Sequence, residues 1–453
     1  MLNVADRLGS GIAEMHLLGA RMIGAVTPAS LAHEAVLYME MDLLRQGWPV
    51  GQSLGALPQL QKRLGLGRPA SREAVTILEA RGLLDVRRGP GGGLFVAAPA
   101  LEDVAGAALM YLALNGGTHA CIVEFRLLVW RMVVTAAVQR RAAPPAWHGA
   151  ISEWGLAVEL AERAGNRTMG HLAQLAEILV RISSSGAVPP RSKPLETAIG
   201  LGNLSDALKH LDALLGPVSE DAPVVALGVP ERGFSLAGRK SAMALAARLA
   251  RELGAHTGTQ EAEWETADRL GYTDAAVRQA RRILQDFGIV RCRRGRKGTE
   301  LAPPAPPTGV IRLLAACLVA SAGSPKDLRE AIHALISSAP ALAARRVKAT
   351  GLPPSVPSSA ATGPDAFELL TLENRLLDLT GNPLLAIIVR SLGLANIFVE
   401  REPPTPLHLS DVMGLNRRIL RAIESGDVTT ADILATAKLQ LMQRSDGEYQ
   451  GAA

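Results

Sequence analysis

The sequence predicts a mainly α-helical protein in which two short units, each of three helices and a β-hairpin, alternate with two antiparallel all-helical bundles. With 453 residues the chain is too long for one ordinary core. Hydrophobic residues make up 48% and aromatic residues only 3%, which favours helices with small side chains at their contacts. A block of sequence also occurs twice, because Arg278 and Gly288 follow Arg72 and Gly82 by the same 206 positions.

Proline- and glycine-rich stretches mark the expected boundaries between these units. We expect the first short unit over residues 28–100 and the first bundle over residues 101–216. A linker is expected over residues 217–238, followed by the second short unit over 239–303 and the second bundle over 308–445. The order of units therefore repeats once along the chain.

The first short unit carries the pattern of three helices. Apolar residues at helical spacing predict helices over residues 31–44, 58–65 and 69–82, and the third has a proline at its start and a glycine at its end. Residues 83–86 and 94–97 alternate as two strands joined by a glycine-rich tip.

The second short unit repeats this order. Helices are predicted over residues 243–253, 266–271 and 273–288, with Thr273 as a candidate N-cap of the third. The sequence RRGRKGTEL over residues 293–301 then takes the place of RRGPGGGLFV in the first unit. Each unit therefore ends in a basic, glycine-bearing hairpin.

Three helices followed by a basic hairpin form a winged helix-turn-helix, an arrangement that can bind duplex DNA. The leading turns of the third helix face base edges in the major groove. Arginines there can bind guanine or phosphates, and glycines let the hairpin backbone approach the sugar-phosphate chain. The predicted DNA-binding residues are Arg68, Ser71, Arg72, Arg87, Arg88, Gly91, Arg278, Arg281, Arg293, Arg294, Arg296 and Lys297.

Other interpretations of the basic tips remain open at this point. Each tip taken alone is equally consistent with a solvated hairpin whose charges have no partner. The repeated helix-plus-hairpin order favours DNA. The GPGGG run at residues 89–93 does not fit a nucleotide-phosphate loop, because no Lys-Ser/Thr pair and no helix follow it.

These residues resemble the winged-helix domain of GntR-family transcriptional regulators. The matching stretches are LGLGRPASREA over 64–74, LEARGL over 78–83 and RRGPGGG over 87–93. The resemblance implies a bacterial-type regulator whose partner is double-stranded DNA.

The helical units resemble the effector-binding bundle of the FadR subfamily, called the FCD domain. The matching stretches are EFR over 124–126, DLR over 327–329, GN over 165–166, GNPLL over 381–385 and AIESGDVTTADILATA over 422–437. The resemblance covers nearly the whole chain, twice. Because members of the family usually dimerise, we expect the tandem duplication to form an internal pseudo-dimer, and pairing between chains is left open.

Two departures from the family weaken the resemblance. The arginine that the family carries before its second helix is absent from the run LGALP over residues 54–58. In the second copy, Thr273 and Asp274 replace the Ser-Arg pair before the recognition helix. A carboxylate that faces phosphates weakens DNA binding, so the first copy is expected to be the stronger base reader.

The resemblance also implies a small organic acid as effector, often with a metal held by one aspartate and three histidines. The corresponding positions are Leu369, Glu373, Asn416 and Lys438 in the second bundle, and Glu153 and Ala157 in the first. Leucine and lysine cannot ligate a divalent ion, so no metal or other cofactor is expected.

One hypothesis is that the Lys438 ammonium takes the metal's place and binds a carboxylate ligand. The candidate pocket residues are Arg126, Arg329, Glu373, Asn416 and Lys438. The alternative is a bundle that has lost its ligand and only packs.

Charge and cysteine usage fit a cytoplasmic DNA-binding protein. The net charge is +5 and the isoelectric point is about 9.3, which favours polyanionic partners. The cysteines form no CxxC pair, no secretory signal is visible, and the apolar run over residues 313–323 is too short to span a membrane. No catalytic motif stands out, so an enzyme is not expected. The rival hypothesis is a helical partner- or ligand-binding protein that has lost specific DNA binding.

Overall fold

The structure is a computed structural model. It describes residues 30–452 except 116, 143–154, 185–188, 217–239, 256–261, 289, 293–298, 302–305, 322, 352–364 and 400–408. The described residues form 18 helices and five strands, so the prediction of a mainly α protein is confirmed. The expected linker over 217–238 lies outside the described residues.

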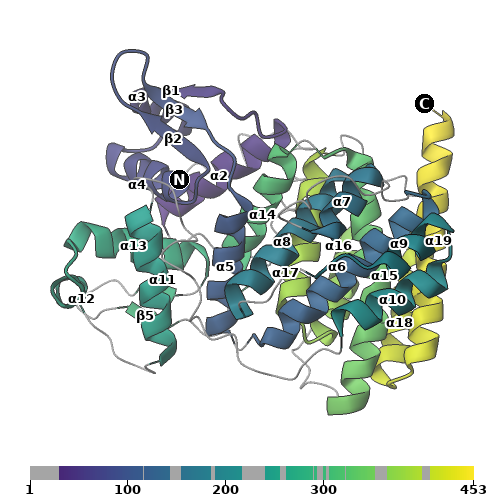
Figure 1. The fold of residues 1–453 in the computed structure, drawn as a ribbon. Helices are drawn as coiled ribbons and strands as arrows, with labels where there is room; N and C mark the ends of the chain where they lie inside the picture. The colour runs from purple at the N-terminus through teal and green to yellow at the C-terminus, as the bar shows by residue number, and fades with distance from the viewer. Residues whose placement is uncertain are drawn as a thin grey trace.

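The first three described helices and a small sheet form a compact unit at one end of the molecule, which we call head 1 (Figure 1). Its helices are α2 (Leu31–Arg45), α3 (Leu57–Leu64) and α4 (Arg68–Ala80). Its strands are β1 (Ser53–Gly55), β2 (Leu84–Arg87) and β3 (Gly93–Val96), in the antiparallel order β1-β3-β2. The β2–β3 hairpin was predicted and β1 was not.

Head 2 repeats the three helices and the hairpin strands. It consists of α11 (Lys240–Ala255), α12 (Glu263–Leu270), α13 (Asp274–Asp286) and the antiparallel strands β4 (Val290–Cys292) and β5 (Thr299–Leu301). The sheet of head 2 has two described strands where that of head 1 has three. The tip between β4 and β5, with Arg293, Arg294, Arg296 and Lys297, lies outside the described residues.

Twelve described helices make up the two bundles. The first bundle contains α5 (Leu101–Leu114), α6 (His119–Gln139), α7 (Leu156–Arg163), α8 (Arg167–Ser184), α9 (Lys193–Gly200) and α10 (Leu204–Leu215). The second contains α14 (Thr308–Ala320), α15 (Pro325–Thr350), α16 (Asp365–Leu379), α17 (Pro383–Val399), α18 (Leu409–Glu424) and α19 (Val428–Ala452). Within the described chain, no helix combines the length and low charge needed to cross a bilayer.

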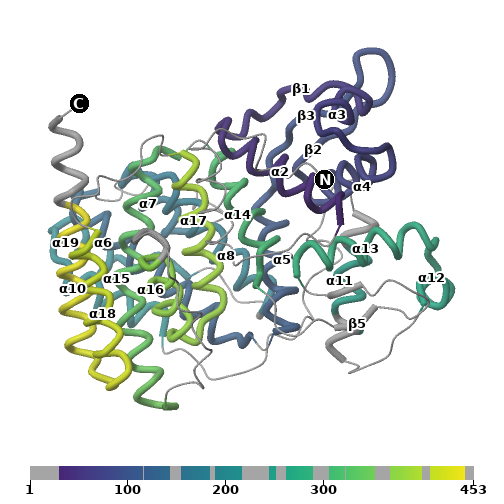
Figure 2. Tube along the Cα trace, turned by 180° about the vertical axis from the view of Figure 1, so that it is seen from behind, coloured from purple at the N-terminus to yellow at the C-terminus, as the bar shows by residue number. Residues whose placement is uncertain are grey.

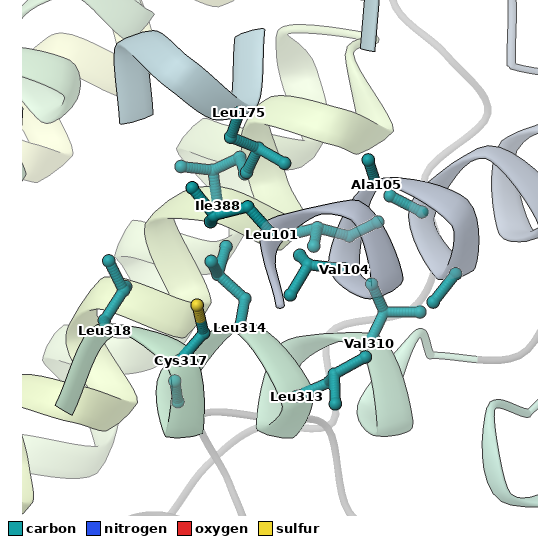
Figure 3. Packing of buried hydrophobic residues seen from close by; sticks show 14 of the residues in the cluster. Leu101, Val104, Ala105, Leu175, Val310, Leu313, Leu314, Cys317, Leu318 and Ile388 are labelled. Carbon is teal, nitrogen blue, oxygen red and sulfur yellow. The ribbon is translucent and has the colours of Figure 1, made fainter. Parts of the chain in front are cut away.

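One hydrophobic core runs through both heads and both bundles. At its centre the apolar faces of α5 and α14 meet, with Leu101 and Val104 close to Val310 and Leu314, and side chains of α8 and α17 close the cluster (Figure 3). A smaller cluster joins α15, α16, α18 and α19 at the end away from the heads (Figure 2). The bundles are therefore not two isolated cores.

The heads pack crosswise on the bundles. Helix α2 of head 1 contacts α14 and α17 of the second bundle, whereas α11 of head 2 contacts α5 of the first bundle. Each head therefore lies against a bundle from the other half of the chain.

Candidate nucleic-acid interface

Two arginines project from the leading turns of α4 in head 1. Gly67 caps the helix with extended backbone and a proline follows Arg68, which suits the start of a helix. Arg68 and Arg72 are exposed, and within the described residues neither makes an ion pair. Because residues four apart share a helix face, the two guanidinium groups are presented together. Lys62 and Arg63, at the end of α3, are also exposed.

The hairpin of head 1 adds a second basic edge. Arg87, Arg88 and Gly91 are exposed, and the Arg87 guanidinium lies over the Phe95 ring, 4.1 Å from its centroid. The tip needs glycine, since Gly91 has φ +75° and a Cβ at Gly92 would lie 2.4 Å from the Arg87 carbonyl oxygen. The hairpin backbone is thus tight and unobstructed by side chains.

Ser71 does not belong to this exposed face. Its side chain is fully buried, and its hydroxyl donates to the Gly67 carbonyl oxygen at 3.1 Å. The expectation that Ser71 contacts DNA is therefore wrong for this structure, because the next position on the helix faces solvent and Ser71 faces the core.

Intramolecular contacts engage the arginines of α13 in head 2. Arg278 pairs with Glu263 at 2.9 Å, and Arg281, only 8% exposed, donates to the Thr266 hydroxyl at 2.9 Å. Asp274 is exposed at the first residue of the helix. The burial of Arg281 contradicts the prediction that it contacts DNA. Arg278 would have to break its ion pair with Glu263 before it could bind DNA.

A buried ionic cluster joins the two heads to the second bundle; we call it the buried quartet and it consists of Glu40, Arg81, Asp286 and Arg312. Arg81 lies 2.9 Å from Asp286 and also pairs with Glu40. Arg312 pairs with Glu40 and lies 2.9 Å from Asp286. The two cations and two anions balance, which is the condition for stable charges in a core.

Burial and charge act in opposite directions on Asp286. Burial alone would raise the pKa of this carboxyl, but the guanidinium groups of Arg81 and Arg312 outweigh burial and hold the pKa below its ordinary value. Sequence reasoning missed the quartet, because its members come from α2, the C-cap of α4, α13 and α14, which are far apart in the chain, and no spacing links them. The only local signal was a charged residue at an otherwise apolar helix position, as at Glu40.

The two bundles contact each other through pairs of equivalent residues. Arg140 of the first bundle binds Glu330 of the second at 2.6 Å, and Arg346 of the second binds Glu124 of the first at 2.9 Å. Arg346 follows Arg140, and Glu330 follows Glu124, by the 206 positions that relate the two sequence blocks. The two ion pairs are therefore reciprocal.

Two asparagines repeat this reciprocity. The Asn166 amide donates to Glu330 at 2.9 Å, and the Asn382 amide donates to Glu124 at 2.9 Å. These contacts align Glu124 with Glu330, so Arg329 corresponds to Val123. The matches EFR over 124–126 and DLR over 327–329 would instead pair Arg329 with Arg126, three positions away.

Three of the five candidate pocket residues meet in the second bundle. The Asn416 amide donates to Glu373 Oε1 at 2.8 Å, and the Lys438 ammonium donates to the same oxygen. Lys438 is 3% exposed and Asn416 is fully buried. The Asn416 Oδ1 atom is buried without a hydrogen-bond partner among the described residues.

The other two candidates are placed differently. Arg126 binds Glu177 with two hydrogen bonds of 2.9 and 2.7 Å in the first bundle, and Arg329 lies half-buried on α15. The donor set at Glu373, Asn416 and Lys438 does not suit a divalent ion, because Lys438 supplies a positive charge where a ligand is needed.

A surface pocket of about 230 Å³ lies elsewhere, between the start of α5 and helices α8 and α14. It contains His171 and Cys317. Burial raises the pKa of the Cys317 thiol to about 12, so the thiol stays protonated at neutral pH and is a poor nucleophile.

Comparisons with known proteins add little to these observations. No family model matches the chain, and no curated protein matches it. Among solved structures the chain is similar to a Streptococcus agalactiae GntR, with a TM-score of 0.30 and 19% sequence identity, over 45% of this chain and 99% of that chain. A likeness this distant carries no weight for function, which has to be inferred from this chain's own residues.

Proposed function

We propose that the chain is a DNA-binding transcriptional regulator of the GntR type that grips duplex DNA through head 1. The observation that carries the proposal is the exposed pair Arg68 and Arg72 on the leading turns of α4, beside a glycine tip flanked by Arg87 and Arg88. A groove-sized helix with guanidinium groups at its N-terminal end, next to a basic hairpin, has the parts needed to bind bases and phosphates together.

The proposal includes a tandem duplication of a FadR-type regulator that folds as an internal pseudo-dimer. The reciprocal pairs Arg140–Glu330 and Arg346–Glu124 support it, because residue i of one half meeting residue j of the other, and the converse, is the signature of a two-fold interface. The crosswise packing of the heads adds support. In this proposal the unit boundaries are those expected from the sequence.

The proposed effector is a small organic acid bound in the second bundle near Lys438. Glu373 already accepts a hydrogen bond from Lys438. The carboxylate of an acid ligand would therefore have to displace Glu373 from the Lys438 ammonium or share the ammonium with it. The unpartnered Asn416 Oδ1 supplies a buried acceptor for a hydroxyl on such a ligand. A thermal-shift screen of small organic acids tests this part, and equal stabilisation of wild type and Lys438→Ala would exclude it.

Selection of genomic fragments followed by a mobility-shift assay tests DNA binding. We expect wild type to retain specific fragments, and Arg72→Ala to bind them about 5- to 150-fold more weakly, as for loss of a bidentate base contact. Arg418→Ala is the matched control, since Arg418 is an exposed arginine on α18 in the second bundle. Equal binding by both variants would contradict the proposal.

A partner-binding protein without DNA activity is the second candidate. Trp264, 63% exposed on α12, favours it, since an exposed tryptophan is a common anchor in protein interfaces. This candidate predicts no shift of any genomic fragment, even at low salt. A shift that weakens steeply with salt excludes it.

A further inference from the structure

We infer that α4 is the single recognition helix of this chain and that α13 is a brace that holds head 1 in place. The inference rests on the proposed DNA binding and specifies the site: one chain reads one half-site. The two heads come from equivalent sequence blocks, yet their corresponding surfaces differ in charge and in the partners of their arginines.

The arginines that α13 would need are engaged inside the protein. Arg278 pairs with Glu263, and Arg281 is buried against Thr266. Arg282 reaches across to head 1 and binds Glu73 of α4 at 3.1 Å. An arginine that has to break an ion pair before it reaches a base contributes less to binding.

The exposed charge of the helix-turn-helix face is also reversed between the heads. Asp274 stands 206 positions after Arg68, and Asp268 stands 206 positions after Lys62. All four side chains are exposed. Carboxylates at the positions where head 1 presents cations repel phosphates instead of releasing counterions.

Helix α13 is fixed where it lies. Asp286, at its last residue, is part of the buried quartet, and Arg81 of head 1 and Arg312 of the second bundle both bind it. If α13 moved into a DNA groove, Asp286 would leave Arg81 and Arg312. The two guanidinium groups would then be buried without this carboxylate, which is costly. The Arg282–Glu73 pair ties the middle of α13 to α4. These contacts give α13 the function of orienting α4.

The test uses the full chain and a fragment selected by wild type. We expect Arg68→Ala to weaken binding about 5- to 150-fold. Arg278→Ala, which removes the α13 arginine that stands 206 positions after Arg72, is expected to change binding less than about 2-fold. Asp274→Arg restores the cation and is expected to leave the fragment length protected from hydroxyl radicals unchanged, because α13 is held away from the groove.

Chain-to-DNA stoichiometry gives an independent readout. A duplex with one half-site is expected to bind one chain, and a palindrome is expected to bind two. One chain that protects two half-sites, or equal losses from Arg68→Ala and Arg278→Ala, would overturn the inference and leave DNA binding intact. Absence of any wild-type complex would overturn the proposed function itself, and this inference with it.

Discussion

Arg68 and Arg81 belong to the same helix region but have opposite environments. Arg68, in the first turn of α4, is exposed. Arg81, the C-cap, is fully buried; it donates to the Gly309 carbonyl oxygen and to Glu40, and it forms an ion pair with Asp286. Their positions on the helix decide this difference, because the N-terminal turn points away from the core and the C-terminal end is covered by α13 and α14. The two arginines therefore allow a direct comparison.

Replacing Arg81 by methionine keeps much of the volume and removes the charge. We expect Arg81→Met to lower the free energy of unfolding by about 3–5 kcal/mol, since it leaves two buried carboxylates with one cation. Arg68→Met is the matched control and should change stability by less than about 0.5 kcal/mol. Chemical denaturation of both variants measures the difference, and similar values would contradict the account of the quartet.

Acid should weaken the fold through Asp286. Its pKa in the folded protein is lowered, so the unfolded chain takes up a proton at a higher pH than the folded chain. The stability that Asp286 contributes is therefore present above about pH 4 and is lost as the pH falls toward its lower folded value. Denaturation between pH 2 and 5 should show a shallower pH dependence for Asp286→Asn than for wild type; parallel curves would argue against this assignment.

Lys438 is expected to be structural even without a ligand. Lys438→Met removes the cation that pairs with Glu373, whose side chain is only 18% exposed. We expect this change to lower the free energy of unfolding by about 3 kcal/mol, because a largely buried carboxylate is left without its partner. Arg417→Ala breaks the exposed pair with Glu368 and should cost less than about 1 kcal/mol. Equal costs, measured by chemical denaturation, would show that burial does not set the strength of the Lys438 pair.

At the scale of elements, the hairpin of head 1 depends on its glycines. Gly92→Ala would place a Cβ 2.4 Å from Arg87 O and 2.7 Å from Gly89 O, both backbone atoms that cannot rotate away. We expect the tip to open and DNA affinity to fall, with a stability cost of about 1–3 kcal/mol. Pro90→Ala, in the same tip, is the control in a mobility-shift assay. Unchanged affinity for Gly92→Ala would mean that the tip does not contact DNA.

The elements were predictable to different degrees. The second and third helices of each head lie within a few residues of their predicted ranges, because amphipathic spacing and terminal glycines are local signals. Strand β1 was missed, since three residues are too few to show alternation. The roles of Ser71 and Arg281 were also missed, because the same residue type is exposed or buried according to which helix face packs on a neighbour.

At the scale of the whole molecule, the two halves are held by equivalent contacts. The repeated spacing led to the proposal of a duplication, but the partners of Asn166 and Asn382 are residues of the opposite half, so no local pattern could identify them. Glu373, Asn416 and Lys438 meet within the second bundle. The family resemblance brought these three residues together as candidates, whereas their spacing in the sequence alone did not.

These contacts predict that the halves remain together when the chain is cut between them. We expect a protease site inserted within residues 217–239 to be cleaved without separating the fragments, because each head packs on the other half's bundle. Size-exclusion chromatography of the cleaved protein should show both fragments in one peak, as for the uncut protein treated in parallel. Two separate folded peaks would contradict the pseudo-dimer.

The salt dependence of DNA binding tests the central claim most directly. With six exposed cations on α3, α4 and the hairpin of head 1 at the phosphates (Lys62, Arg63, Arg68, Arg72, Arg87 and Arg88), the logarithm of the binding constant should fall against the logarithm of salt with a slope of about −5. The Arg68→Ala/Arg72→Ala double variant should bind at least about 10-fold more weakly. A flat salt dependence, or a double variant that binds like wild type, would contradict the claim that head 1 grips duplex DNA.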